Sequence, residues 1–171
     1  MFSKILGVYR RLFWSAEKYG RYLGVSIGEK CSIATKYFGS EPYLVKIGNH
    51  VQITNGVKFF THGGGWVFRK DIPDFDTFGK IEIKDNVYIG NNVLIMPGVT
   101  INSNVIIAAG SVVTRSIPEG KIIGGNPAKE IGEVSNLRER LLPINTKTKG
   151  LNYENKKRIL LKLDSEKFII K

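Results

Sequence analysis

Between residues 83 and 117 the chain repeats a six-residue unit whose first position is aliphatic and whose fifth position is small or branched. The first positions are Ile83, Ile89, Ile95, Ile101, Ile107 and Val113, and the fifth positions are Val87, Val93, Val99, Val105, Ser111 and Ile117. A period of six matches neither an α-helix nor a simple strand. It predicts a three-sided coil in which each unit supplies one short strand and one corner, and three units complete a turn.

The same register continues toward the N-terminus. Ile47, Ile53 and Phe59 open further units, and the interval from residue 59 to residue 83 is again a whole number of units. We therefore expect two blocks of one coil, with residues 63–80 expelled as a long loop. Less regular units at residues 27 and 33 are out of phase with the rest, which predicts a small insertion around residues 40–44, SEPYL.

The repeat and the tail of the coil point to one family. The units follow the hexapeptide pattern of an aliphatic residue, Gly, two polar residues and a small or aliphatic residue, and the tail reads IIAAGSVVTRSIPEGKIIGGNPAKEIG. In both features the chain resembles the left-handed parallel β-helix acyltransferases, in the branch of maltose, galactoside and surface-polysaccharide O-acetyltransferases. The resemblance covers residues 25–132 and implies an all-β solenoid with left-handed crossovers, an exception to the usual rule. It also implies acetyl-CoA as co-substrate, no metal, and a homotrimer.

The segments on either side of the coil carry most of the net charge of +11. Residues 1–24 hold five basic and one acidic residue, and residues 138–171 hold ten and four. The nearly neutral middle argues against nucleic acid as a partner, since that needs a continuous basic face. Residues 1–24 have apolar positions at helical spacing, which predicts an amphipathic helix. Its apolar face would cap the coil, pack on a neighbouring subunit, or lie on an anionic membrane.

The remaining segments give expectations about structure and location. Residues 133–171 form a basic extension, with a short helix predicted around residues 156–163 and an extended end. No apolar run could span a bilayer, and we find no signal peptide. Cys31 is the single cysteine, which excludes an intrachain disulfide and suits a buried thiol. We expect a cytoplasmic protein, peripheral at the inner membrane surface if the N-terminal helix contacts lipid.

Transfer of an acyl group to an alcohol needs a base for the hydroxyl proton, and histidine suits this role near neutral pH. The chain has two histidines. His50 lies at an outward position of a regular unit, which predicts a solvated surface residue. His62 follows the last strand before the expelled loop and precedes three glycines. In the resembled family the catalytic histidine occupies this place, so the resemblance implies that His62 is the general base.

The group that orients His62 is left open by the sequence, because Gly63 stands where an Asp often follows the histidine in this branch. The candidates are a backbone carbonyl, Glu41, and the loop carboxylates Asp71, Asp74 and Asp76. The loop also mixes aromatic and charged residues, which is typical of sugar sites, although the aromatics could instead pack the loop onto the coil. We predict an acceptor site drawn from Glu41, Asn55, Trp66, Arg69 and Asp71.

The donor site is predicted from the period. Asn91, Ala109 and Pro127 follow one another at intervals of three units and should form one column, at which backbone groups would bind the pantetheine arm as in the family. The basic residues Arg115, Lys121 and Lys129 are candidates for the phosphates of coenzyme A, and solvated surface charges are the alternative.

Other functions of such coils are less compatible with the sequence. A γ-type carbonic anhydrase needs three histidines on one zinc ion, and a sugar nucleotidyltransferase needs a further domain. A non-enzymatic scaffold that docks on membranes is the remaining alternative. For an enzyme, the acceptor is open among a cell-surface glycan or its lipid-linked precursor, a free sugar and an antibiotic. We favour the glycan.

Overall fold

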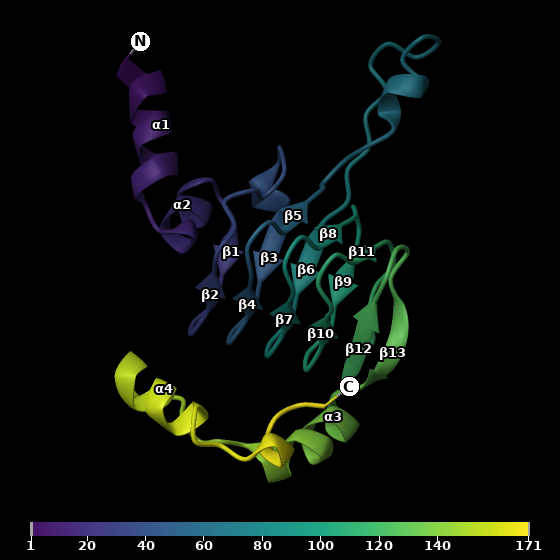
Figure 1. Ribbon diagram of the computed structural model, residues 1–171. Coiled ribbons are helices and arrows are strands. Elements are labelled where there is room, and N and C mark those ends of the chain that lie inside the picture. The colour runs from purple at the N-terminus through teal and green to yellow at the C-terminus, as the bar shows by residue number, and fades with distance from the viewer. Residues whose placement is uncertain (1, 171) are drawn as a thin grey trace. The chain divides into compact units, whose positions relative to one another are not determined.

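A computed structural model describes residues 2–170, and its strands form three sheets that the chain visits in turn (Figure 1). The first sheet contains β1 (Ser26–Ile27), β3 (Val45–Ile47), β6 (Ile81–Ile83) and β9 (Thr100–Ile101). The second contains β2 (Ser32–Ile33), β4 (Gln52–Ile53), β7 (Tyr88–Ile89), β10 (Ile106–Ile107), β12 (Lys121–Gly124) and β13 (Lys129–Glu133). The third contains β5 (Lys58–Phe59), β8 (Leu94–Ile95) and β11 (Val112–Val113). All neighbours pair in parallel except β12 and β13.

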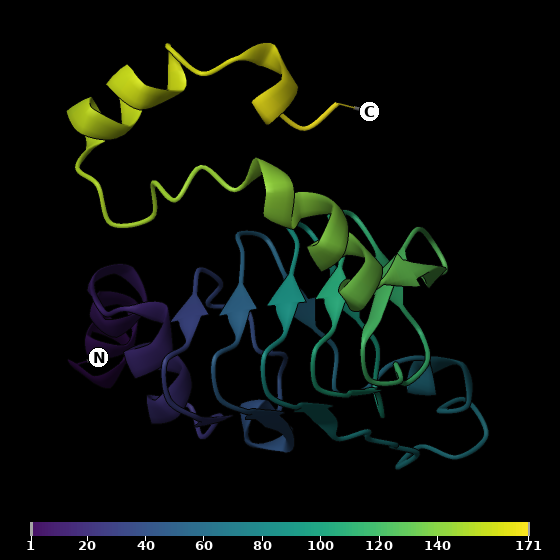
Figure 2. The same ribbon diagram turned by 90° about the horizontal axis from the view of Figure 1, so that it is seen from below.

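The predicted repeat sets the register of these sheets. Ile89 pairs with Ile107, which is three units later, and Ile53 pairs with Ile89 across the expelled loop. Strands of successive turns therefore lie side by side (Figure 2). The six first positions from Ile83 to Val113 are at most 1% exposed, so they form the dry interior that the pattern predicted. Ser111 is buried among them with its hydroxyl donating to Ala108 O at 2.6 Å, which satisfies its polar group.

The last turn departs from the predicted period. Ile107 pairs with Ile123 and Ile101 with Ile117, so this turn is shorter than three full units. Since Ile95 still pairs with Val113, exactly three units later, the shortening lies at the corner between Val113 and Ile117. Ile117 consequently lies beside the first positions of the first sheet, and its predicted place in the column of fifth positions is wrong.

The N-terminal segment forms two helices, α1 (Phe2–Phe13) and α2 (Ala16–Tyr22), where the sequence predicted one. The break occurs because Ser15 caps α2, its hydroxyl accepting a hydrogen bond from Lys18 N at 3.2 Å. Ala16 and Gly20 of α2 are buried, and a Cβ on Gly20 would lie 3.0 Å from the ring of Phe38. Helix α2 thus covers the first turn of the coil, and α1 extends beyond α2 (Figure 1).

The C-terminal part is a second compact unit, Ser135–Lys171, whereas Val134 belongs to the unit of the coil. It contains most of α3 (Val134–Leu141) and all of α4 (Tyr153–Leu160), with 3-10 turns at Leu142–Ile144 and Ser165–Lys167. The helix predicted around residues 156–163 thus begins earlier, at Tyr153, because Asn152 caps it by accepting from Asn155 N at 2.9 Å. Within residues 2–170, every helix is too short or too polar to cross a membrane.

Candidate active site

The expelled loop leaves the coil at the corner between the third and first sheets. After β5, Thr61 and His62 lead into the loop, and Phe78 and Gly79 lead back to β6. His62 and Phe78 form an antiparallel bridge, and Gly79 N donates to Thr61 O at 2.8 Å, so the base of the loop is closed beside His62. A Cβ on Gly79 would lie 2.2 Å from the backbone nitrogen of Gly98, so only glycine fits where the chain re-enters the coil.

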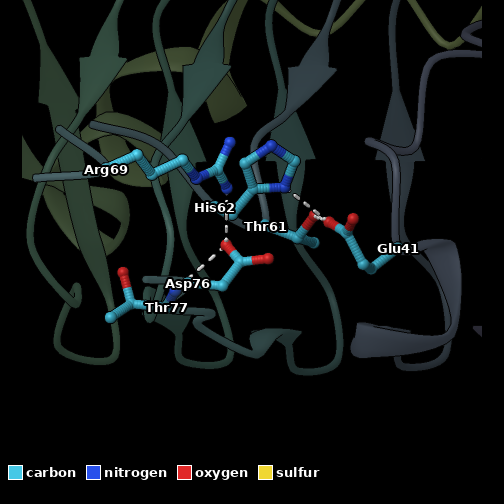
Figure 3. Close-up of polar contacts among 6 residues, drawn as sticks. All are labelled: Glu41, Thr61, His62, Arg69, Asp76 and Thr77. Atoms are coloured by element: carbon cyan, nitrogen blue, oxygen red, sulfur yellow. Dashed lines mark hydrogen bonds and ion pairs between the residues drawn. The ribbon is translucent and has the colours of Figure 1, made fainter. Parts of the chain in front are cut away.

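Glu41 reaches this corner from the predicted insertion, which forms a short 3-10 turn at Pro42–Leu44. Its Oε2 lies 2.8 Å from Nδ1 of His62 and accepts a hydrogen bond from the hydroxyl of Thr61 (Figure 3). Of the candidates for orienting the imidazole, Glu41 is therefore the one in contact. Asp76 instead pairs with Arg69 at 3.5 Å within the loop, and Asp71 and Asp74 are exposed.

The contact between Glu41 and His62 determines which imidazole nitrogen carries the proton. Hydrogen bonds from Thr61 and then from His62 lower the pKa of Glu41 below its ordinary value of 4.5. Glu41 is therefore ionised at neutral pH and can only accept hydrogen bonds. The proton of a neutral His62 must then be on Nδ1, which leaves the lone pair on Nε2. The Glu41 side chain is 16% exposed and that of His62 is 41% exposed, so the imidazole can meet a substrate.

A hollow of about 90 Å³ adjoins His62. It is lined by Tyr37, Gly39, Ser40, Phe59, Phe60, Thr61 and His62. Phe78 adds an edge-on contact with the imidazole, with ring centroids 5.8 Å apart. The hollow beside the imidazole thus combines aromatic rings with the hydroxyl groups of Ser40 and Thr61, which suits a ligand that has both apolar faces and hydroxyl groups.

The loop projects away from the sheets (Figure 1). Its aromatic side chains Trp66, Phe68 and Phe78 are exposed. Phe68 and Phe75 pack on each other at 4.8 Å, and Arg69 Nε donates to Phe75 O at 3.0 Å. Trp66 is 81% exposed. The predicted acceptor residues Trp66, Arg69 and Asp71 thus lie on a projecting arm beyond His62, and only Glu41 among the predicted acceptor residues touches His62.

Asn55 is not near His62, because it lies at a different corner. That corner, between the second and third sheets, also contains Asn91 and Ala109, and Asn91 Oδ1 accepts from Asn55 N at 3.1 Å. Asn55 therefore lies in the same column as the predicted donor residues Asn91 and Ala109, and its role toward the acceptor stays a prediction.

The third member predicted for the donor column is wrong. In the shortened last turn Ile107 pairs with Ile123, so the interval of three full units that placed Pro127 opposite Ala109 does not hold. Gly125 lies beside the next strand, because its backbone oxygen accepts a hydrogen bond from Val112 N at 3.0 Å. A signal for this shift was present in the sequence, since the two isoleucines and two small residues of IIAA at residues 106–109 recur as IIGG at residues 122–125. Both Ala109 and Gly125 are exposed and small, so a ligand can approach their backbone closely.

The three predicted phosphate partners differ in their surroundings. Arg115 is exposed at the shortened corner between the third and first sheets, the same corner as His62 and two turns further along. Lys129 is exposed on β13, and within residues 2–170 neither side chain forms an ion pair.

Lys121, unlike the other two, is paired with carboxylates. Its ammonium group contacts Glu133 at 2.7 Å and Glu130 at 2.9 Å. The hydrogen bonds to Glu133 and then Glu130 raise the pKa of Lys121 and hold its charge in place across the β12–β13 hairpin. The role predicted for Lys121 stays a prediction, and a phosphate would have to compete with these two carboxylates.

His50 lies at the third corner of the coil, between the first and second sheets. It is exposed, has a φ of 53°, and its Nδ1 lies 2.9 Å from Oδ1 of Asn86. Asn86 and Asn104 occupy the equivalent positions of later turns with φ of 56° and 58°, which Asn tolerates well. Within the described part of the chain, no group of three or more His, Cys, Asp or Glu side chains could hold a metal ion.

Comparison with known proteins places these features in context. The family described as bacterial transferase hexapeptide (six repeats) matches residues 80–115. The chain is 53% identical over 145 residues to protein CapG of Staphylococcus aureus, and the match covers 82% of this chain and 84% of CapG. CapG thus resembles the chain over most of both sequences.

Two solved acetyltransferases share the fold. A hexapeptide-repeat-containing acetyltransferase from Vibrio cholerae matches with a TM-score of 0.62 and 25% identity over 77% of this chain and 88% of its own. Its complex with acetyl-CoA matches with a TM-score of 0.56 and 26% identity over 77% and 84%. A galactoside acetyltransferase in complex with coenzyme A matches with a TM-score of 0.53 and 23% identity over 72% and 81%, which shows similarity of fold alone.

Proposed function

Because the chain belongs to the bacterial hexapeptide-repeat transferases, we propose that it transfers acetyl from acetyl-CoA to a hydroxyl of a sugar in a cell-surface glycan. The chain is an acyltransferase and acetyl-CoA is its donor. The observation that carries the rest of the proposal is the contact of His62 with Glu41 at the base of the projecting loop. It provides an oriented base at an exposed site on a rigid coil.

In the proposed mechanism His62 is the general base. With its Nδ1 proton held by Glu41, Nε2 accepts the proton of the acceptor hydroxyl as the oxygen attacks the thioester carbonyl. The carbon–sulfur bond then breaks, coenzyme A leaves, and the imidazolium returns the proton to the sulfur. The negative Glu41 stabilises the imidazolium between these two steps, and base catalysis of this kind contributes on the order of 10² to 10⁴ in rate.

We further propose that the coil is left-handed and that three copies form a trimer, as the resemblance implies. The arrangement of the corners supports a site shared between subunits. His62 and the column of Asn91 and Ala109 lie at different corners of one coil, so a single subunit cannot bring the column to its own His62. A neighbouring coil of the trimer could bring its own column to this His62. The column would bind the pantetheine arm, and Arg115 and Lys129 would bind the phosphates of coenzyme A.

The glycan acceptor is supported by two features. The exposed Trp66 and the Arg69–Asp76 pair present an aromatic face and charged groups of both signs, which suit the apolar and hydroxyl faces of a sugar ring. The name of the similar protein CapG favours a capsular glycan. A free sugar and an antibiotic are the competing acceptors. A screen of all three compounds distinguishes among them by showing which one gains the mass of one acetyl group.

The two histidines offer a matched test of the base. We expect His62→Asn to lower the rate of coenzyme A release with acceptor by roughly 10² to 10⁴. His50→Asn should keep the wild-type rate, because Asn86 and Asn104 already occupy the equivalent corner positions. Thermal unfolding would verify that both variants are folded. A His62→Asn enzyme with the wild-type rate on a verified acceptor would exclude His62 as the base.

A further inference from the structure

Helix α1 has one continuous apolar face that the described part of its own chain leaves uncovered. With 3.6 residues per turn, its described apolar side chains fall within about 160° of the helix circumference. All five are exposed: Leu6 at 41%, Val8 at 59%, Tyr9 at 52%, Leu12 at 66% and Phe13 at 71%. Because α2 already caps the first turn of the coil, this face is not needed to close the hydrophobic core.

Cationic side chains border this face. The opposite arc of α1 carries Arg10 and Arg11, and α1 contains no acidic residue in its sequence. Lys36 joins them, because its ammonium group donates to the backbone carbonyl of Arg11 at 2.6 Å. Within residues 1–24 the single acidic residue is Glu17. The apolar face is therefore flanked by positive charge toward the C-terminal end of α1.

Aromatic side chains at the C-terminal end of α1 hold the cations in place. The guanidinium of Arg10 lies 4.4 Å from the ring centroid of Tyr22 and 5.5 Å from that of Trp14, and it donates to the Tyr22 hydroxyl at 2.6 Å. The ammonium of Lys18 lies 4.4 Å from the Trp14 ring. Trp and Tyr beside Lys and Arg are the combination found at the boundary between lipid tails and head groups.

We propose that α1 binds the surface of an anionic lipid bilayer, with Leu6, Tyr9, Leu12 and Phe13 among the lipid tails and Arg10, Arg11 and Lys36 at the head groups. A basic helix that is apolar on one side and too short to span a membrane lies in the plane of the interface. Charge favours lipid over a second copy of α1, since two α1 helices would bring cations together with no acidic partner on either. This proposal stands apart from the acetyl transfer.

The test uses the full-length protein and sedimentation with vesicles of phosphatidylcholine, alone or mixed with phosphatidylglycerol. We expect binding to the mixed vesicles and little to phosphatidylcholine alone. Arg11→Gln should weaken binding roughly fivefold, and about 1 M NaCl should abolish most of it. The double variant Leu12→Gln, Phe13→Gln should weaken binding by roughly tenfold or more, because two exposed apolar side chains no longer enter the lipid.

Leu161→Gln is the matched control, since Leu161 is 77% exposed but lies in the C-terminal unit, and it should bind as the wild type does. Oligomer mass and the rate of acetyl transfer to a soluble acceptor should be unchanged in all variants, which separates this proposal from the proposed activity. Three results would overturn it: no binding of wild type to the mixed vesicles, wild-type binding by the double variant, or a double variant whose oligomer mass falls, which would assign the face to a subunit interface.

Discussion

At the scale of single residues, the pair of Glu41 and His62 makes the clearest prediction. Glu41→Gln replaces an acceptor-only carboxylate with an amide that can present either oxygen or NH₂ to Nδ1, so the imidazole loses its fixed tautomer. We expect kcat to fall by roughly 10² to 10⁴ while the KM for the acceptor stays near wild type. Steady-state kinetics would check this, and a rise in KM alone would show that Glu41 binds the acceptor instead.

The same pair predicts how stability depends on pH. Hydrogen bonds from Thr61 and His62 lower the pKa of Glu41 in the folded state, so the pair stabilises the fold above the ordinary value of 4.5. This contribution is lost as the pH falls through the folded-state pKa. The difference in Tm between wild type and Glu41→Gln should therefore shrink as the pH falls below the ordinary carboxyl value of 4.5. A difference that grows as the pH falls below 4.5 would contradict the direction of the shift in the pKa of Glu41.

Arg115 and Lys121 give a matched pair for the donor site. Both are basic, but Lys121 is bound by Glu130 and Glu133, whereas Arg115 is exposed without an ion pair in the described part of the chain. We expect Arg115→Ala to raise the KM for acetyl-CoA roughly tenfold, through loss of a charge-assisted hydrogen bond to phosphate. Lys121→Ala should leave that KM unchanged. Equal effects from both substitutions would mean that Arg115 acts only through the overall charge.

At the scale of elements, the strands were predictable and the corners were less so. Each buried first position such as Ile95 could be read from the repeat, because burial inside a stacked coil demands an aliphatic side chain once in every unit. Burial does not constrain the length of a corner in this way. The corner between Val113 and Ile117 is shortened, and this shifted Pro127 out of the column predicted for it.

Contacts that join distant segments were the other limit of sequence reasoning. Glu41 was one of several candidates for orienting His62, because the direction of its insertion depends on packing against a distant part of the chain. The pairing of Lys121 with Glu133 depends on an antiparallel hairpin that the repeat does not predict. His62 was singled out because it precedes the long loop and because the family resemblance implies a catalytic histidine there, and its role as the base stays a prediction.

The projecting loop predicts an effect on the acceptor without an effect on the fold. Trp66 is 81% exposed and its neighbour Val67 is 76% exposed, so neither supports the coil in this chain. We expect Trp66→Ala to raise the KM for the glycan acceptor by roughly fivefold to tenfold, through loss of stacking on a sugar ring. Val67→Ala should not change it. Unfolding temperatures should be unaltered in both, and equal kinetics of the two variants would remove Trp66 from the acceptor site.

At the scale of the whole molecule, a site shared between subunits can be tested by complementation. His62→Asn removes the base, and Ala109→Trp would block the donor column at a different corner. Each variant alone should be inactive. When equal amounts are coexpressed, about one subunit interface in four combines an intact His62 from one subunit with an intact donor column from its neighbour. The activity of a cyclic trimer should therefore recover to about a quarter of wild type. Mixing His62→Asn with Glu41→Ala is the control, because these residues touch within one chain and no mixed interface restores both. If the first mixture stayed as inactive as its components while forming trimers, each site would have to lie within a single coil.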